Sequence, residues 1–212
     1  MKKFSHKLIF GTDFPGAPGI RNNYKQVKNL IRDDAAMELI GFWNAYNLFG
    51  FWKEGIFEIK DQSEIYTVIN DGSKRYKGVI PEDRYHEPYM PVDELLGEMK
   101  RMRFYGYRKD LKLIGVMAKE PIKDVTLMRH AYVLTEHQGK GIGSQLLAFI
   151  EKQVGTEWLL IGTWKAATWA IDFYKKHGYE LMNNKDDLLR KYWDIPERQI
   201  ETSCVLGKRM GR

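Results

Sequence analysis

Three glycines within five residues, Gly139, Gly141 and Gly143, constrain this chain more than any other feature, because they lie between a predicted strand and a predicted helix. Glycine lets the backbone approach a ligand closely and turn consecutive N–H groups into one concavity. A helix that begins near Gly143 adds its own unpaired N–H groups and the positive end of its dipole. The pattern predicts a turn that holds phosphate oxygens, and a purely structural turn is the alternative.

Two common phosphate-binding motifs do not fit these residues. The dinucleotide motif Gly-x-Gly-x-x-Gly would need a glycine where Ser144 stands. The mononucleotide P-loop would need Ser or Thr after Lys140, where Gly141 stands. If this turn binds a phosphate ligand, the chain therefore belongs to neither of these two classes of nucleotide-binding protein.

From residue 55 onward the sequence predicts a mixed α/β domain. Strands are predicted at 56–59, 104–107, 113–118, 125–134, 158–162 and 201–208, and helices at 63–75, 91–99, 143–154 and 167–177. The run 125–134 is apolar on both faces, which indicates a central strand. The helix that follows Pro91 is expected to bury an apolar face made of Val92, Leu95, Leu96 and Met99.

The order of these elements and two motifs resemble the GNAT superfamily of N-acetyltransferases. The first motif is Gln138-x-x-Gly141-x-Gly143, and the second is the Phe-Tyr-x-x-x-Gly-Tyr pattern at 173–179. The resemblance is strongest over 125–180 and extends more loosely over 56–208. It implies an α/β (α+β) fold with a mixed, splayed central sheet flanked by helices. It also implies a function, the direct transfer of the acetyl group of acetyl-CoA to an amine of an acceptor that the sequence does not identify.

The resemblance assigns a role to each matching residue. The backbone of the loop would bind the CoA pyrophosphate, and this cofactor-binding set is Gln138, Gly139, Lys140, Gly141, Ile142, Gly143 and Ser144. Tyr132, Val133 and Leu134 would face the pantetheine arm, which adds to the sheet as a strand would. An N–H of Val133 or Leu134 would stabilise the oxyanion.

A second group of expected site residues lies on the helix at 167–177. Tyr174 would protonate the departing thiolate as a general acid, with Phe173 beside it among the cofactor-binding residues. The alternative is that both rings are core aromatics. The sequence departs from the family at Ala167, where many members carry an asparagine.

Neither a general base nor an acceptor site is evident from the sequence. Glu136 lies close to the loop, and His130 lies on the central strand, where a structural histidine is the alternative. An acceptor pocket of aromatic residues is a further hypothesis, and its candidates are Tyr85, His86, Tyr89, Trp164 and Trp193.

Residues 1–54 predict a separate N-terminal extension, with the acetyltransferase domain at 55–212. The extension has a glycine- and proline-rich turn followed by two helical patterns. Its Gly11-Thr12-Asp13 segment resembles the C-terminal end of metal-dependent amidohydrolases, in which the aspartate serves a metal site. Eight strands and several histidine ligands would be needed for such a barrel, and this chain has only five scattered histidines. We therefore expect no metal, and we expect the two helices to pack on the transferase domain or on a partner, for example in a homodimer.

Composition limits the remaining alternatives. The single cysteine, Cys204, allows no internal disulfide and favours a cytoplasmic protein, and no apolar run reaches the length of a membrane span. The net charge of +6 favours an anionic partner. Basic and aromatic residues alternate over 100–109, so a nucleic-acid-binding module is one alternative function. A non-catalytic acetyl-CoA sensor is the other.

Overall fold

The computed structural model describes residues 54–110 and 112–211. The extension predicted at 1–54, with its turn, its two helices and Asp13, lies outside the described residues except for Glu54.

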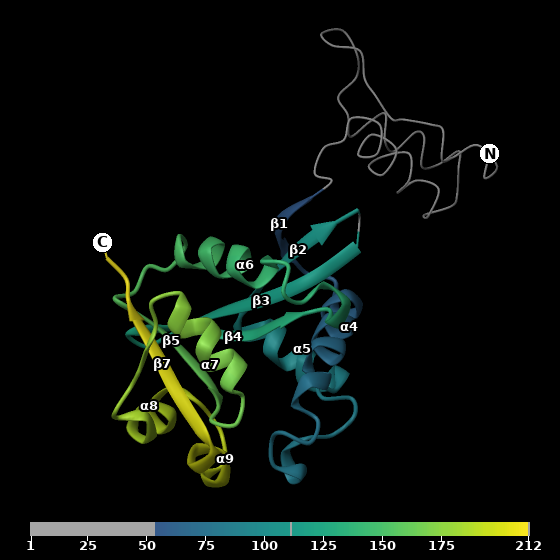
Figure 1. Ribbon diagram of the computed structural model, residues 1–212. Coiled ribbons are helices and arrows are strands. Elements are labelled where there is room, and N and C mark those ends of the chain that lie inside the picture. Colours follow the sequence, from purple (N-terminus) through teal and green to yellow (C-terminus); the bar gives the residue numbers. More distant parts are fainter. Residues whose placement is uncertain (1–53, 111, 212) are drawn as a thin grey trace, which may run out of the picture. The chain divides into compact units, whose positions relative to one another are not determined.

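A seven-stranded sheet in the order β1-β2-β3-β4-β5-β7-β6 forms the centre of the described domain (Figure 1). Its strands are β1 Glu54–Ile59, β2 Arg103–Lys109, β3 Lys112–Ile122, β4 Val125–Val133, β5 Trp158–Trp164, β6 Glu180–Leu181 and β7 Ser203–Arg209. All neighbouring strands are antiparallel except β4 and β5, which are parallel. The mixed sheet is confirmed, and so is the central place of the strand predicted at 125–134.

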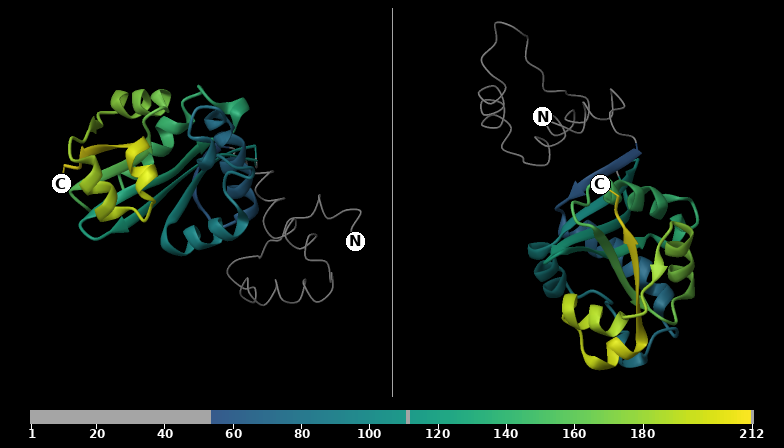
Figure 2. Two further views of the ribbon diagram at one scale, coloured as in Figure 1. Left: turned by 90° about the horizontal axis from the view of Figure 1, so that it is seen from below. Right: turned by 90° about the vertical axis from the view of Figure 1, so that its left-hand side faces the viewer.

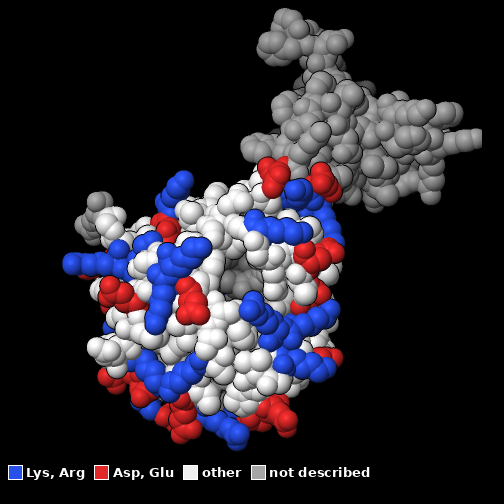
Figure 3. Space-filling model, in the orientation of Figure 1, with Lys and Arg blue, Asp and Glu red and all other residues white. Residues whose placement is uncertain are grey.

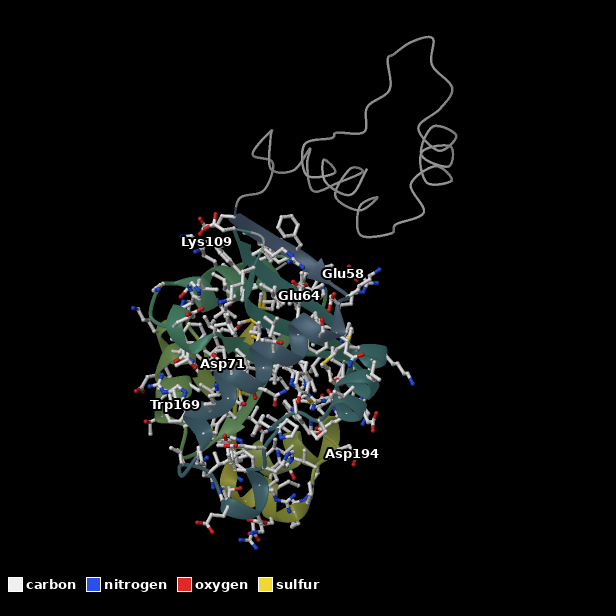
Figure 4. All side chains as sticks on the ribbon, turned by 90° about the vertical axis from the view of Figure 1, so that its right-hand side faces the viewer. Glu58, Glu64, Asp71, Lys109, Trp169 and Asp194 are labelled. Carbon is white, nitrogen blue, oxygen red and sulfur yellow. The ribbon has the colours of Figure 1, made fainter. Side chains whose placement is uncertain are left out.

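Helices cover both faces of this sheet (Figures 1 and 2). They are α4 Gln62–Gly72, α5 Val92–Arg101, α6 Ile142–Glu151, α7 Thr168–Lys176, α8 Lys185–Tyr192 and α9 Glu197–Thr202. Helix α4 begins at a regular N-cap, where Asp61 Oδ1 accepts from the N–H groups of Ser63 and Glu64 at 2.8 and 3.1 Å. The side chain of Glu64, in the same first turn (Figure 4), accepts from Arg108 of β2 at 2.8 Å, and this contact fastens α4 to the sheet.

The apolar face predicted for α5 is wrong in part. Leu95 is fully buried, but Val92 and Leu96 are each 41% exposed. Glu98, one turn after Leu95, is buried instead. Hydrophobic periodicity could not identify this face, because its second member is a carboxylate that finds partners on β4.

Helices α8 and α9 were not predicted. Their sequence is rich in charged residues, and among the residues of the two helices only Leu189, Tyr192 and Ile200 are buried. Such short helices depend on tertiary packing for their stability more than on their own pattern. Here they pack beside β7, and the loop between them carries Trp193 and Ile195.

The sheet splays between β4 and β5, as predicted. The two strands pair only from Val125–Trp158 to Met128–Ile161, and β5 then continues paired with β7 alone. A β-bulge lies where they part, because Ala118 pairs with Arg129 while Val116 pairs with Tyr132. Two residues of β4 therefore oppose one residue of β3, which bends β4 away from β5.

Candidate active site

A cavity of about 440 Å³ opens where β4 and β5 separate. Its walls come from β3, β4, β5, the start of α6 and one face of α7, with Gly72, Arg75 and Tyr76 from the end of α4 and the turn after it. Lys and Arg side chains border a hollow on this face of the molecule (Figure 3). Three cations, Arg75, Arg129 and Lys176, line the cavity. The position favours an elongated ligand that carries negative charge.

The glycine loop forms one end of this cavity. Gly139 and Gly141 have φ angles of +74° and +79°, in the left-handed region that glycine adopts without strain. Gly141 is the N-cap of α6 and has no side chain to cap it, so the first N–H groups of the helix are free of a capping partner. This is the arrangement that binds phosphate oxygens at a helix N-terminus.

Six of the seven predicted loop residues line the cavity: Gln138, Gly139, Gly141, Ile142, Gly143 and Ser144. Gln138 Nε2 donates to the Val133 carbonyl at 3.1 Å and thereby ties the loop to the end of β4. Lys140 is turned away, because its Nζ donates to the Glu136 carbonyl at 2.8 Å. Ser144 Oγ lies 3.0 Å from His177 Nε2, which joins α6 to α7 beside the loop.

Asp71 near the end of α4 was not foreseen as part of this site. Its carboxylate accepts from the N–H of Thr135 at 2.7 Å and from Lys74 Nζ at 2.8 Å (Figure 4). Burial works against ionisation, but these partners outweigh it and lower the pKa of Asp71. The contact fixes the turn between β4 and the loop. An aspartate on a helix gives no local sign of a partner 64 residues away, so the sequence carried no signal for it.

Val133 and Leu134, the two candidates for an oxyanion donor, differ in the structure. The Leu134 N–H donates to the Ile114 carbonyl of β3 at 2.9 Å, so the prediction that it faces the splay is wrong. Successive N–H groups of a strand point to opposite sides. The N–H of Val133 therefore points away from β3, toward the side where β5 no longer pairs with β4. The Val133 carbonyl points to the same side, where it accepts from Gln138 Nε2.

Tyr132 lines the cavity but also belongs to a cluster of aromatic rings. Its ring centroid lies 6.3 Å from that of Tyr76 and 6.3 Å from that of Tyr89, both in edge-on geometry. Trp169 lies 5.6 Å from Tyr76 and is covered by the guanidinium of Arg75 at 4.4 Å. The sequence did not bring these rings together, because they come from four separate segments.

Tyr174 and Phe173 both line the cavity. Tyr174 is 6% exposed, and burial, with Tyr76 nearby, raises the pKa of its hydroxyl well above the ordinary value. Its ring packs edge-on against Phe173 at 5.0 Å and against Tyr179 at 5.7 Å. The residue is thus a packed aromatic and a wall of the cavity at once, so the two interpretations of the sequence do not exclude each other.

His130 lies in the β-bulge with a φ of +51°, an uncommon conformation for a residue other than glycine. Its Nε2 is 3.0 Å from the buried carboxylate of Glu98, and its ring stacks on Phe104 at 5.6 Å. Burial would keep Glu98 neutral, but the hydrogen bond from His130 and the charges of Arg129 and Arg101 prevail and lower its pKa to about 2. An ionised carboxylate only accepts, so Nε2 of His130 carries the hydrogen of this contact.

Glu136, the other candidate base, does not line the cavity. It is exposed and paired with Lys112 at 2.6 Å.

Of the five residues suggested for an aromatic acceptor pocket, the structure brings three together. Tyr89, Trp164 and Trp193 line a second cavity of about 150 Å³. Tyr85 and His86 do not line it, although their rings contact Tyr89 at 5.9 and 6.3 Å.

The basic and aromatic run at 100–109 does not expose its rings. Three rings of this run, those of Phe104, Tyr105 and Tyr107, lie on β2 and belong to the hydrophobic core, where each residue is 5% exposed or less. Rings in this position are not available to stack on nucleic-acid bases. Cys204 is also buried, on β7, and burial raises the pKa of its thiol.

Within residues 54–110 and 112–211, no group of three or more His, Cys, Asp or Glu residues is placed to hold a metal ion. In the same part of the chain, none of the helices has the length and apolar character needed to cross a bilayer.

Comparison with known families gives a match over the centre of this domain. Residues 100–181 match the model of the acetyltransferase (GNAT) domain. The matched segment contains β4, the glycine loop and Tyr174. The comparison with curated proteins gives no match.

Solved structures share the fold of the described domain. The PaiA N-acetyltransferase of Thermoplasma acidophilum, in complex with coenzyme A, aligns with a TM-score of 0.58 at 20% identity over 74% of this chain and 98% of its own. A GNAT-family acetyltransferase of Staphylococcus aureus Mu50 aligns with a TM-score of 0.58 at 12% identity over 74% and 99%. A GNAT-family acetyltransferase of Elizabethkingia anophelis, with acetyl-CoA bound, aligns with a TM-score of 0.52 at 19% identity over 74% and 99%. The architecture is therefore the GNAT fold, and residues 100–181 are similar to the GNAT acetyltransferase domain.

Proposed function

We propose that this protein transfers the acetyl group of acetyl-CoA directly to an amine. The observation that carries the proposal is the cavity between β4 and β5, which has the uncapped glycine loop at one end and Tyr174 in its wall. Coenzyme A needs both a pyrophosphate site and a narrow channel for its pantetheine arm, and the residues present fit both. The likeness to structures that hold CoA or acetyl-CoA supports the same ligand.

In this proposal the loop binds the donor and β4 orients it. The N–H groups from Gln138 to Ser144 hold the pyrophosphate, and the pantetheine arm lies beside β4 in the place that β5 has left. The free N–H of Val133 then donates to the thioester carbonyl and stabilises the oxyanion that forms on attack. Such a donor contributes about 10²–10³-fold to the rate in other acyl transfers.

The proton transfers involve two further residues. The amine nitrogen attacks the thioester carbon, so a C–N bond forms, and the C–S bond then breaks. His130 accepts a proton from the attacking amine, and Tyr174 donates its hydroxyl proton to the departing sulfur. The raised pKa of Tyr174 keeps it protonated before this step, as a general acid requires.

A thermal-shift titration with acetyl-CoA and CoA, with NADH and ATP as controls, tests donor binding. A ligand specific for the folded state stabilises it by about 2.7 kcal/mol at a hundredfold excess over its dissociation constant. We expect acetyl-CoA and CoA alone to raise the Tm, and Gly141→Glu to abolish the shift. Gly155→Glu is the matched control, because it adds the same charge in open space at the opposite end of α6. Equal shifts with ATP or NADH, or no shift at all, would refute the proposal.

His130→Asn tests the proposed base. Asparagine tolerates a positive φ, so the bulge is retained while the proton acceptor is lost. We expect kcat near neutral pH to fall about 10²-fold, with acetyl-CoA affinity unchanged. The loss should diminish toward pH 10, where solvent deprotonates an alkyl amine. A variant with unchanged kcat would show that His130 is only structural.

A further inference from the structure

The second cavity lies next to the donor cavity at the point where the sheet splays. The two cavities share seven lining residues: Tyr76, Met128, Arg129, His130, Tyr132, Gly162 and Thr163. The remaining walls of the second cavity come from other parts of the fold, including Tyr89, Trp164, Trp193 and Gln199. None of these residues belongs to the glycine loop. A molecule in the second cavity would therefore meet the donor across the segment of β4 that carries His130.

Aromatic rings dominate this second cavity. Tyr76 and Tyr89 stack at 5.7 Å with planes 20° apart, and Tyr132 meets both rings edge-on. Trp193 closes the opposite side by lying against Gly162 of β5, where a Cβ atom would come within 3.2 Å of its ring. Any larger residue at position 162 would push Trp193 away from the cavity. The walls thus favour a flat apolar group and a nearby cation, which aromatic faces attract.

Carboxylates are absent from the described residues that line this cavity. Its two basic residues are already engaged, since Arg129 donates to Glu120 at 3.1 Å and His130 contacts Glu98 at 3.0 Å. No lining group is placed to pair with a second ammonium of the acceptor. This argues against polyamines and other polycations, whose recognition requires carboxylates.

The volume limits the size of the group. A cavity of about 150 Å³ has room for a group of the size of one benzene ring. We therefore expect a single six-membered ring to be preferred over a larger fused ring system.

From these walls, charges and dimensions we propose that the acceptor is a small primary monoamine with a single aromatic ring, bound with the ring in the second cavity and the amine beside His130. This inference rests on the proposed acetyl transfer. The ring of the acceptor packs between Trp193 and the tyrosines, and its amine reaches the boundary between the two cavities.

The test uses the full chain with three probes: 2-phenylethylamine, n-butylamine and spermidine. Free CoA thiol is measured as each amine is acetylated. We expect kcat/KM for 2-phenylethylamine to be at least tenfold higher than for either other amine. Trp193→Ala and Trp193→Leu should each raise KM for 2-phenylethylamine at least tenfold and lower kcat/KM for n-butylamine by a much smaller factor, whereas Trp193→Phe should keep the preference for the ring.

The outcomes separate this inference from the proposed function. An acetyl-CoA thermal shift retained by each Trp193 variant shows that the variant is folded and binds the donor. Equal or faster acetylation of spermidine, or an equal loss for both monoamines in Trp193→Leu, would overturn the aromatic acceptor and leave acetyl transfer intact. A protein without any acetyl-CoA shift would instead contradict the proposed function. Binding of 2-phenylethylamine alone, followed by the indole N–H resonance of Trp193, provides a readout that does not depend on turnover.

Discussion

At the scale of single residues, the most informative group is Glu98, a carboxylate buried on the sheet side of α5. It holds His130 at 3.0 Å and pairs with Arg101 at 2.5 Å. Arg129 lies 3.6 Å from Glu98 and also pairs with Glu120 at 3.1 Å, so the two carboxylates share this guanidinium. A buried carboxylate with such partners stays ionised at pH values far below its usual pKa, so the stability of the folded protein depends on pH.

We expect Glu98 to contribute to acid unfolding. Its pKa is about 2 in the folded protein and near 4.5 when unfolded, so the unfolded state binds the proton more readily. The stabilisation, on the order of 3 kcal/mol, is fully present above pH 4.5 and is lost as the pH falls toward 2. Urea unfolding of the wild type and of Glu98→Gln between pH 2.5 and 7 measures it. The two free energies of unfolding should converge as the pH falls, and a constant difference would show that the carboxylate does not titrate as inferred.

Sequence reasoning reached some residues of the site and missed others for physical reasons. The loop glycines could be predicted because a positive φ and a close approach of the backbone both require glycine, and a cluster of glycines is visible in the sequence itself. Asp71 and Glu98 were missed because their partners lie 64 and 32 residues away in the chain. A long-range hydrogen bond to a side-chain carboxylate leaves no pattern in the neighbouring sequence.

At the scale of elements, the end of β4 separates two functions over two adjacent residues. Leu134 donates its N–H to β3 and so holds the sheet together, whereas Val133 points its N–H to the open side. The alternation of a strand thus lets one residue serve the fold and its neighbour serve the ligand. The sequence predicted both residues as candidates, because which N–H faces the splay depends on the register and the bulge, and neither can be seen in the sequence.

Proline substitutions at these two positions should have opposite effects. Val133→Pro removes an N–H that the ladder does not use, so we expect kcat to fall about 10²–10³-fold with a small change in stability. Leu134→Pro should cost about 1–3 kcal/mol, because the Ile114 carbonyl loses its donor. The φ of Leu134 is −48°, which proline adopts readily, so the lost hydrogen bond is the main change. Steady-state kinetics and urea unfolding of both variants measure the two effects, and unchanged kcat in Val133→Pro would exclude Val133 as the oxyanion donor.

At the scale of the whole molecule, the described residues contain everything that the proposed reaction needs. The sheet, both cavities, the glycine loop and His130 all lie within 54–211. The element order of this domain could be predicted because its longer strands and helices carry clear periodicity. Three residues suggested for an acceptor pocket, Tyr89, Trp164 and Trp193, do line the second cavity, but the sequence could not show that they meet, because α8, α9 and the loop of Trp193 assemble around β5 only through tertiary contacts.

A shortened chain tests whether this domain is sufficient. A domain of about 150 residues buries roughly 68–70% of the surface that its unfolded chain exposes, which is enough for independent folding. We expect residues 52–212 to unfold cooperatively and to bind acetyl-CoA within about threefold of the affinity of the full chain, because none of the described residues that line the donor cavity lies before Gly72. Circular dichroism on heating and isothermal calorimetry measure the two properties side by side with the full chain. If the shortened chain folds but binds acetyl-CoA more than tenfold more weakly, the first 51 residues contribute to the donor site, and the site proposed for the described domain is incomplete.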